Sequence, residues 1–157
     1  MRDFCNYEDI IYKITKWCAY QERSEFQVRQ KLQEWEVSDK DIEVILNYLK
    51  EENYVNEERF LQSYIHGKLS KKWGLEKIKH HLKQQHHISE SKINEIIKNI
   101  EIDNYIDTLK QLILKKYQQL QEKEQDKMHL KKKIINFALS KGYNFQDIYS
   151  VLEELKF

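Results

Sequence analysis

Four histidines lie close together in the sequence, and their side chains are the first candidates for metal ligands: His80, His81, His86 and His87. Zinc-binding histidine pairs on a helix usually lie four residues apart, which brings both rings to one side. No two histidines of this group have that spacing, and neighbouring residues on a helix point about 100° apart. We therefore expect a solvent-exposed basic surface here and no metal site.

Lysine dominates the segment between His66 and His87, which holds six lysines and one acidic residue, Glu76. Such a cluster can attract phosphate groups or an acidic protein surface, and it can equally be an ordinary solvated helix surface. Trp73 lies within it, and an aromatic ring among basic residues can stack on nucleic-acid bases or cap a protein core. The candidate partner-binding residues are Lys68, Lys71, Lys72, Trp73, Lys77, Lys79 and Lys83.

The sequence offers no recognisable catalytic group. No nucleophile is accompanied by a base and an orienting residue, and the phosphate-binding patterns GxGxxG and GxxxxGK are absent. The two cysteines, Cys5 and Cys18, are a poor disulfide framework. Cys18 falls on an apolar helical stripe, as expected of a small buried residue. We expect a protein that is not an enzyme and that needs no cofactor.

Composition limits both the location and the fold class. No apolar run approaches the roughly 20 residues of a membrane span, and the N-terminal residues lack the apolar core of a signal peptide. We therefore expect a cytoplasmic protein without a membrane partner. The 157 residues include no proline and three glycines, with 40% apolar and 34% charged residues. Sandwiches and barrels of many short strands need more turn residues than this, so an elongated all-α protein with a thin core is expected.

Apolar residues recur with helical spacing along almost the whole chain and form nine stripes. Several predicted helices begin with Ser or Asn, whose side chain can accept hydrogen bonds from the first helical turn. An apolar residue before this cap and another four places after it can pack together as a hydrophobic staple. The four caps of this kind are Ser38, Asn56, Ser89 and Asn144. Gly142 suits the position just past the end of the eighth helix.

The stripes contain an internal repeat. The pattern I-x-x-[IV]-[IL]-x-x-[LI] occurs at 42–49, 93–100 and 148–155, each time after one of these caps. A repeat of about 50 residues with three helices buries little apolar surface alone, so neighbouring units must stack. The sequence predicts an all-α fold of three tandem three-helix repeats, 1–53, 54–102 and 103–157, that form an elongated, curved array.

Two stretches resemble one family, the regulatory protein RecX family, whose members are small bacterial modulators of the recombinase RecA. The first is RSEFQVRQKL at 23–32, followed by the helix of residues 42–49. The second is YVNEERF at 54–60, then KKWG at 71–74, then Ile78, Leu82 and Ile88. Family members read R-x-x-S-x-x-E-L-x-x-K-L, a leucine-rich helix, L-[DN]-D-x-x-[FY] and G-x-x-x-I-x-x-E-L. The resemblance covers about residues 17–100, and beyond Glu101 it rests on repeat spacing.

The chain departs from the family pattern at several polar and glycine positions. Gln27 and His81 replace the glutamates of the two E-L pairs. The glycine expected after the K-L helix is missing from the segment 35–37, and the expected Lys-Gly before Ile88 reads His86-His87. These changes leave the apolar frame intact and affect residues that could contact a partner.

The resemblance implies a non-enzymatic regulator that works in bacterial DNA recombination, DNA repair and the SOS response. Family members fold as three tandem three-helix repeats. They bind the RecA filament on single-stranded DNA and usually limit its ATPase and strand-exchange activity. We therefore expect a protein that binds this filament, that is monomeric and that can also make weak direct contact with nucleic acid.

Two alternatives remain open at this stage. Three-helix units also serve as helix-turn-helix DNA-binding modules, and the last helix of the middle repeat would then present Lys92, Asn94, Lys98 and Asn99. That helix also carries acidic residues and lacks arginine for bidentate guanine contact. The other alternative is a helical scaffold for a different protein partner.

Overall fold

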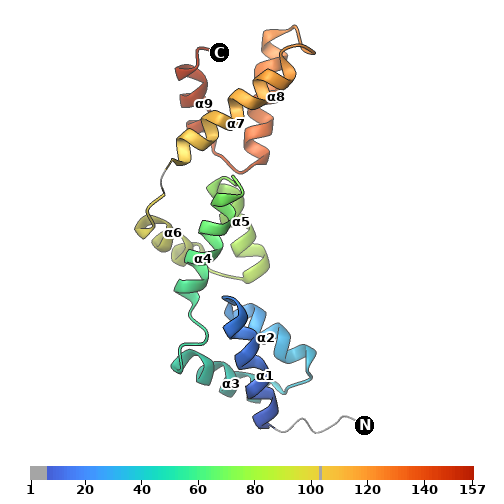
Figure 1. The fold of residues 1–157 in the computed structure, drawn as a ribbon, viewed down its shortest axis with the longest axis vertical. Coiled ribbons are helices and arrows are strands. Elements are labelled where there is room, and N and C mark those ends of the chain that lie inside the picture. The colour runs from blue at the N-terminus through green and yellow to red at the C-terminus, as the bar shows by residue number, and fades with distance from the viewer. Residues whose placement is uncertain (1–6, 103) are drawn as a thin grey trace.

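The computed structural model describes residues 7–102 and 104–157, and in this part of the chain all regular structure is helical. The helices are α1 Tyr7–Tyr20, α2 Glu25–Glu34, α3 Asp39–Glu51, α4 Glu57–Ser70, α5 Leu75–His86, α6 Glu90–Asn99, α7 Tyr105–Leu120, α8 Lys127–Ser140 and α9 Phe145–Glu154. They form three groups of three, arranged one after another along the long axis of the molecule (Figure 1). We call these groups the first, second and third repeats.

The molecule is elongated, with α1–α3 at one end and α7–α9 at the other (Figure 1). Its accessible surface is 10757 Å². A compact monomer of 19.3 kDa would expose only about 8,500 Å². The larger surface follows from stacking three small units in a row, because each unit meets its neighbours only at its ends.

Each repeat has its own hydrophobic core. The first core contains Ile14, Cys18, Val28, Leu32, Ile42, Ile45, Leu46, Leu49 and Val55. The second contains Phe60, Leu61, Ile65, Ile78, Leu82, Ile88, Ile93 and Ile96. The third contains Leu109, Ile113, Leu130, Ile134, Ala138, Tyr143, Ile148, Val151 and Leu152. The expected buried position of Cys18 is confirmed, whereas Cys5 lies outside the described residues.

The four predicted helix caps are confirmed. The side chains of Ser38, Asn56, Ser89 and Asn144 each accept a hydrogen bond from a backbone N–H of the first turn of α3, α4, α6 and α9 respectively. Ser24 provides a further cap for α2, and Gln27 completes it by accepting from the Ser24 backbone N–H at 3.0 Å. Such reciprocal caps satisfy two backbone donors that a helix start otherwise leaves unpaired.

The predicted staples differ in where their two apolar residues lie. Val37 and Ile42 share the first core, and the pairs at the starts of α6 and α9 also share one core each. Val55 instead packs in the first core while Phe60 packs in the second. The residue before α4 therefore anchors the connection to the preceding repeat, and only the residue inside α4 belongs to the following one.

Several residues just past helix ends have left-handed backbone conformations, and three of them bear on the sequence patterns. Gly142 has φ +101° and lies beyond α8, as predicted. Glu36 and His87 have φ +60° and +52°, and they occupy the two places where the family pattern led us to expect glycine. A side chain in this conformation costs roughly 1–2 kcal/mol, so the chain tolerates local strain where glycine would relieve it.

Candidate partner-binding surface

The seven candidate residues lie at the end of α4, in the turn that follows it and on α5. α4 ends at Ser70, and the backbone then reverses through Lys71 and Lys72, the latter with φ +67°. Gly74 immediately precedes α5 and, having no side chain, provides no side-chain cap for it. The turn and the following helix are fixed instead by contacts with the third repeat.

Backbone hydrogen bonds join the second and third repeats at this turn. The Gly74 N–H donates to the Lys141 carbonyl at 2.7 Å, and the Glu76 N–H donates to the Gly142 carbonyl at 2.9 Å. A side-chain carbon on Gly74 would lie 2.2 Å from the Gly142 carbonyl carbon, and one on Gly142 would lie 2.3 Å from the Lys77 Cβ. Only glycine permits the backbones to approach so closely. The local sequence patterns did not reveal that Gly74 and Gly142 serve this close contact between repeats.

Two tyrosines of the third repeat reinforce the same junction. The Tyr105 hydroxyl accepts from the Leu75 N–H at 2.8 Å, and the Tyr143 hydroxyl donates to the Lys72 carbonyl at 3.2 Å. Burial raises the pKa of Tyr143 to about 12 and raises the pKa of Tyr105 further. Both hydroxyls therefore stay protonated at neutral pH, and the turn that carries Trp73 is held against the third repeat.

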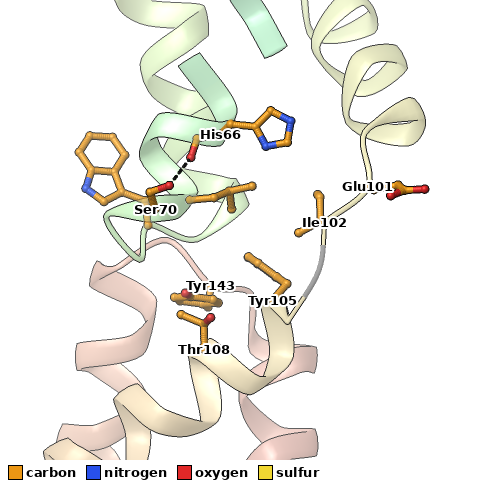
Figure 2. A pocket seen from close by; sticks show the side chains of 9 residues that line it. His66, Ser70, Glu101, Ile102, Tyr105, Thr108 and Tyr143 are labelled. Carbon is orange, nitrogen blue, oxygen red and sulfur yellow. Dashed lines mark hydrogen bonds between the residues drawn. The ribbon is translucent and has the colours of Figure 1, made fainter. Parts of the chain in front are cut away.

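A cavity of about 360 Å³ lies at this junction, shown in Figure 2. His66 and Ser70 approach it from α4, and Tyr105, Thr108 and Tyr143 approach it from the third repeat. Trp73 also lines it. The lining combines aromatic rings and hydroxyl groups with the side chains of His66 and Glu101.

Trp73 is half-buried and joins the core to the basic surface. Its ring packs against the second core. The Nζ atoms of Lys68 and Lys77 lie 4.5 and 4.2 Å from the ring centre, and the His81 ring meets it edge-on at 4.9 Å. Each ammonium–ring contact of this kind contributes about 0.5–1 kcal/mol near the surface. The ring thus holds two lysine side chains in place while remaining partly exposed.

Lys68, Lys71 and Lys77 carry positive charge that no ion pair compensates, and we call these three residues the Trp73 cluster. None of the three forms an ion pair with another described residue. The neighbouring Lys72 also forms no ion pair with another described residue. Partial burial lowers the pKa of Lys68, and the like charges of Lys71 and Lys77 lower it further. An anionic partner would relieve this repulsion.

The other candidate lysines have different surroundings. Lys79 pairs with Glu76 at 3.7 Å, and Lys83 pairs with Glu90 at 3.2 Å. Lys77 and Lys79 point to different sides of α5, because two residues on a helix turn through about 200°. The Lys72 side chain is exposed beside the cluster. The seven residues therefore form one stretch of sequence but not one uniform patch.

The helix considered for direct DNA contact is α6. Lys92, Asn94, Lys98 and Asn99 are all exposed on it. Lys92 pairs with Glu57 at 2.8 Å, and its hydrogen bond to this carboxylate raises the pKa of Lys92. The first half of α6 thus has its charges compensated, which is unfavourable for binding a phosphate backbone.

Our expectation of a solvent-exposed histidine surface is wrong for His86. His80 and His87 are exposed and His81 is half-buried against Trp73, but His86 has only 9% of its surface accessible. Its ring lies between the first and second repeats, where α2 and α5 meet. Sequence spacing could not reveal this burial, because the partner residues come from another repeat. Among the described residues, no group of three or more His, Cys, Asp or Glu side chains is placed to hold a metal ion.

Comparisons with known proteins identify the family. Three family models match the chain: the RecX first three-helix domain at residues 15–49, the second at 56–96 and the third at 103–152. A regulatory protein RecX from Haemophilus influenzae strain PittEE is 30% identical over 88% of this chain and 90% of its own length. This chain belongs to the RecX family. The resemblance seen in the sequence motifs is confirmed, and the matches extend it beyond residue 101.

Other RecX relatives are longer than this chain. The regulatory protein RecX of Clostridium tetani is 36% identical over 85% of this chain, and the alignment spans 61% of the relative. The corresponding protein of Clostridium acetobutylicum is 28% identical over 99% of this chain and 74% of its own length. The names of these relatives support a regulatory role.

Solved RecX structures share the fold. The crystal structure of RecX from Lactobacillus salivarius superposes with a TM-score of 0.84 at 18% identity and covers 96% of both chains. A second crystal structure of regulatory protein RecX gives 0.79 over 96% of this chain. The predicted all-α fold of three tandem three-helix domains is confirmed, while the repeat boundaries at 53/54 and 102/103 stay a prediction. The helices of the described residues are too short or too polar to span a membrane.

Proposed function

We propose that this protein binds the RecA filament assembled on single-stranded DNA and lowers its DNA-dependent ATP hydrolysis without catalysing a reaction itself. Membership of the RecX family through all three domains suggests the partner. The binding surface contains Lys68, Lys71, Lys72, Trp73, Lys77, Lys79 and Lys83. The observation that carries this choice is the Trp73 cluster, in which the ammonium groups of Lys71 and Lys77 repel that of Lys68 and none of the three forms an ion pair with another described residue.

The shape of the molecule supports binding along a filament. An array of three small units offers a long contact surface and can touch several subunits of a polymer at once. Many separate polar contacts give a binding energy that falls as salt screens the charges. A monomer is sufficient for this mode, because the array itself supplies the repeated contact units.

The test is inhibition of the RecA ATPase on single-stranded DNA by two variants with the same change in charge. Lys71→Gln with Lys77→Gln removes two uncompensated charges of the Trp73 cluster. Lys79→Gln with Lys83→Gln removes two charges that Glu76 and Glu90 already compensate. We expect the first variant to need about tenfold more protein for half-inhibition, equivalent to about 1.4 kcal/mol, and the second to need less than about threefold more.

Three outcomes decide between the proposals. Equal, small effects of both variants would place the contact elsewhere on the array. Wild-type protein that leaves the ATPase unchanged, at low salt and in excess over RecA, would contradict filament regulation itself. Binding to free duplex DNA as tight as binding to the filament would favour the helix-turn-helix alternative. Circular dichroism of each variant verifies that loss of inhibition does not reflect unfolding.

A further inference from the structure

The two junctions of the array are built differently. Between the second and third repeats the backbones themselves are hydrogen-bonded at Gly74 and Gly142. Between the first and second repeats, no backbone hydrogen bond joins α1–α3 to α4–α6 within residues 7–102. Side chains hold this first junction. It lies where α2 approaches α5 (Figure 1). A junction held by side chains can therefore depend on whether a few of those side chains are protonated.

His86 lies at the centre of the first junction. Its Nδ1 is 2.9 Å from the Oγ of Ser24, which is fully buried. The rings of Phe60 and Tyr64 lie 4.9 and 5.4 Å from the His86 ring. The neighbouring His87 ring contacts Phe26 of the first repeat at 4.3 Å. One short segment at the end of α5 therefore provides two of the contacts that hold the first repeat.

The hydrogen bonds of Ser24 define the protonation state that this contact needs. The Ser24 Oγ accepts from the Gln27 N–H at 3.2 Å as the cap of α2. Its own hydroxyl hydrogen is then available to donate, and His86 Nδ1 is the acceptor in reach. The arrangement that satisfies the Gln27 N–H, the Ser24 hydroxyl and His86 Nδ1 together has a neutral ring with its proton on Nε2. A proton on Nδ1 would replace this acceptor by a donor and leave the buried hydroxyl hydrogen without a partner.

We propose that the junction between the first and second repeats is a pH-sensitive joint, closed while His86 is neutral and released when this ring takes up a proton. The released state differs from the closed one by loss of the Ser24–His86 and Phe26–His87 contacts, while the three cores stay folded. This joint is independent of the proposed filament binding, because it concerns the isolated protein.

The charged groups around His86 determine the direction of the pH effect. Lys68 of α4 and the adjacent His87 disfavour a further positive charge, and Lys71, just past α4, lines the same pocket as His86. Glu57 of α4 favours it, but Glu57 pairs with Lys92 of α6. Glu22 of the first repeat lines the same pocket and pairs with Arg59 of α4. Tyr64 faces the ring, and burial raises the pKa of Tyr64, so this group stays neutral.

Burial is the largest influence and lowers the pKa of His86 below the ordinary value of 6.5. An exposed histidine, as in the released joint, binds its proton at a higher pH than the buried one. The closed joint is therefore fully stabilised above about pH 6.5 and loses this stabilisation as the pH falls through the lower pKa of the buried ring.

Nuclear magnetic resonance of the full chain tests the joint between about pH 8 and about pH 5. The Cε1 proton of His86 reports protonation, and the nuclear Overhauser effect between the Phe26 and His87 rings reports closure. We expect both to change with one shared midpoint, below the ordinary histidine value of 6.5, while circular dichroism shows constant helicity. Small-angle scattering should show an increase in radius of gyration across the same midpoint.

Two matched variants assign the effect to one ring. His86→Gln keeps an acceptor for Ser24 but cannot be protonated, so we expect its Phe26–His87 contact to persist across the whole range. His80→Gln, on the exposed side of the same helix, should behave as the wild-type protein. A Phe26–His87 contact that persists after His86 is protonated in the wild-type protein would overturn the proposal, and so would release in His86→Gln. The pH titration of the wild-type protein tests the proposal even if His86→Gln does not fold.

Discussion

Leu82 and Lys83 are neighbours on α5 and have opposite environments. Leu82 is fully buried in the second core, whereas the Lys83 side chain is 40% exposed and pairs with Glu90. We expect Leu82→Ala to lower the free energy of unfolding by about 2–5 kcal/mol, because it removes apolar contacts and leaves a cavity. Lys83→Ala should change it by less than about 1 kcal/mol, since an exposed ion pair contributes little. Urea unfolding measures both, and similar losses would mean that the face of α5 is wrongly assigned.

Cys18 gives a second test at the scale of one residue. Its thiol is buried in the first core, and loss of solvation raises the pKa of Cys18 to about 11. Because the thiolate is the reactive form, the native thiol should react with a disulfide reagent at neutral pH at least about a hundredfold more slowly than an exposed one.

The measurement uses a Cys5→Ser background, so that Cys18 is the remaining thiol. Reaction of the native protein is compared with reaction of the same protein unfolded in urea, which supplies the exposed reference. Equally fast reaction in both states would mean that the first core opens readily or that Cys18 is not part of it.

At the scale of elements, substitution of Gly74 can be compared with substitution of Gly67, a glycine in the neighbouring helix α4. A side-chain carbon on Gly74 would collide with the backbone at Gly142, whereas one on Gly67, inside α4, would meet no atom within 4 Å. We expect Gly74→Ala to lower the free energy of unfolding by about 1–3 kcal/mol, as overpacking does. Gly67→Ala should raise it by up to about 1 kcal/mol, because alanine favours the helix.

The site of the damage distinguishes this explanation from a general loss of stability. Amide hydrogen exchange in Gly74→Ala should accelerate at Glu76, whose N–H donates across the junction to Gly142, before it accelerates inside the second core. Unchanged protection at Glu76, or equal effects of the two substitutions, would contradict the close approach of the two glycines.

Local sequence signals were sufficient to predict the elements but not the junctions between them. Caps such as Ser38 and Asn144 act on amides three residues away, and the apolar period identifies the buried face of each helix. The Ser24–His86 contact joins residues 62 positions apart. Helical periodicity says which face is buried but not which distant helix covers it, so His86 was interpreted as a surface residue.

The same limit applies to the candidate site. The sequence identified a stretch of lysines around Trp73, and its i,i+3 pair of Glu76 and Lys79 follows from helix geometry. Lys68 and Lys77 contact the indole ring, whereas Lys83 pairs with Glu90 at the start of α6. This difference can be seen only when the positions of α4, α5 and α6 are known. The charge pattern of the sequence therefore identifies the lysine-rich segment, but it does not identify which of its lysines lack an ion pair.

At the scale of the whole molecule, the array divides into units of unequal coupling. Three separate cores make each repeat a small folding unit, and such arrays gain stability from the contacts between neighbours. The second junction combines backbone hydrogen bonds with two buried tyrosine hydroxyls. The first junction depends on side chains, among them the hydrogen bond between Ser24 and His86. The second and third repeats should therefore behave as one body and the first repeat as another.

Native-state hydrogen exchange at rising denaturant concentration tests this division, because amides that open together share one unfolding free energy. We expect the most protected amides of α4–α9 to converge on a single value and those of α1–α3 to converge on a different one. In Gly74→Ala the first group should itself separate into α4–α6 and α7–α9, because the contact that unites them is lost, while Gly67→Ala should preserve two groups. Convergence of the whole wild-type chain on one value would mean that the first junction is as strong as the second. The side-chain contacts at Ser24 and His86 would then stabilise the array as much as the backbone contact at Gly74 and Gly142.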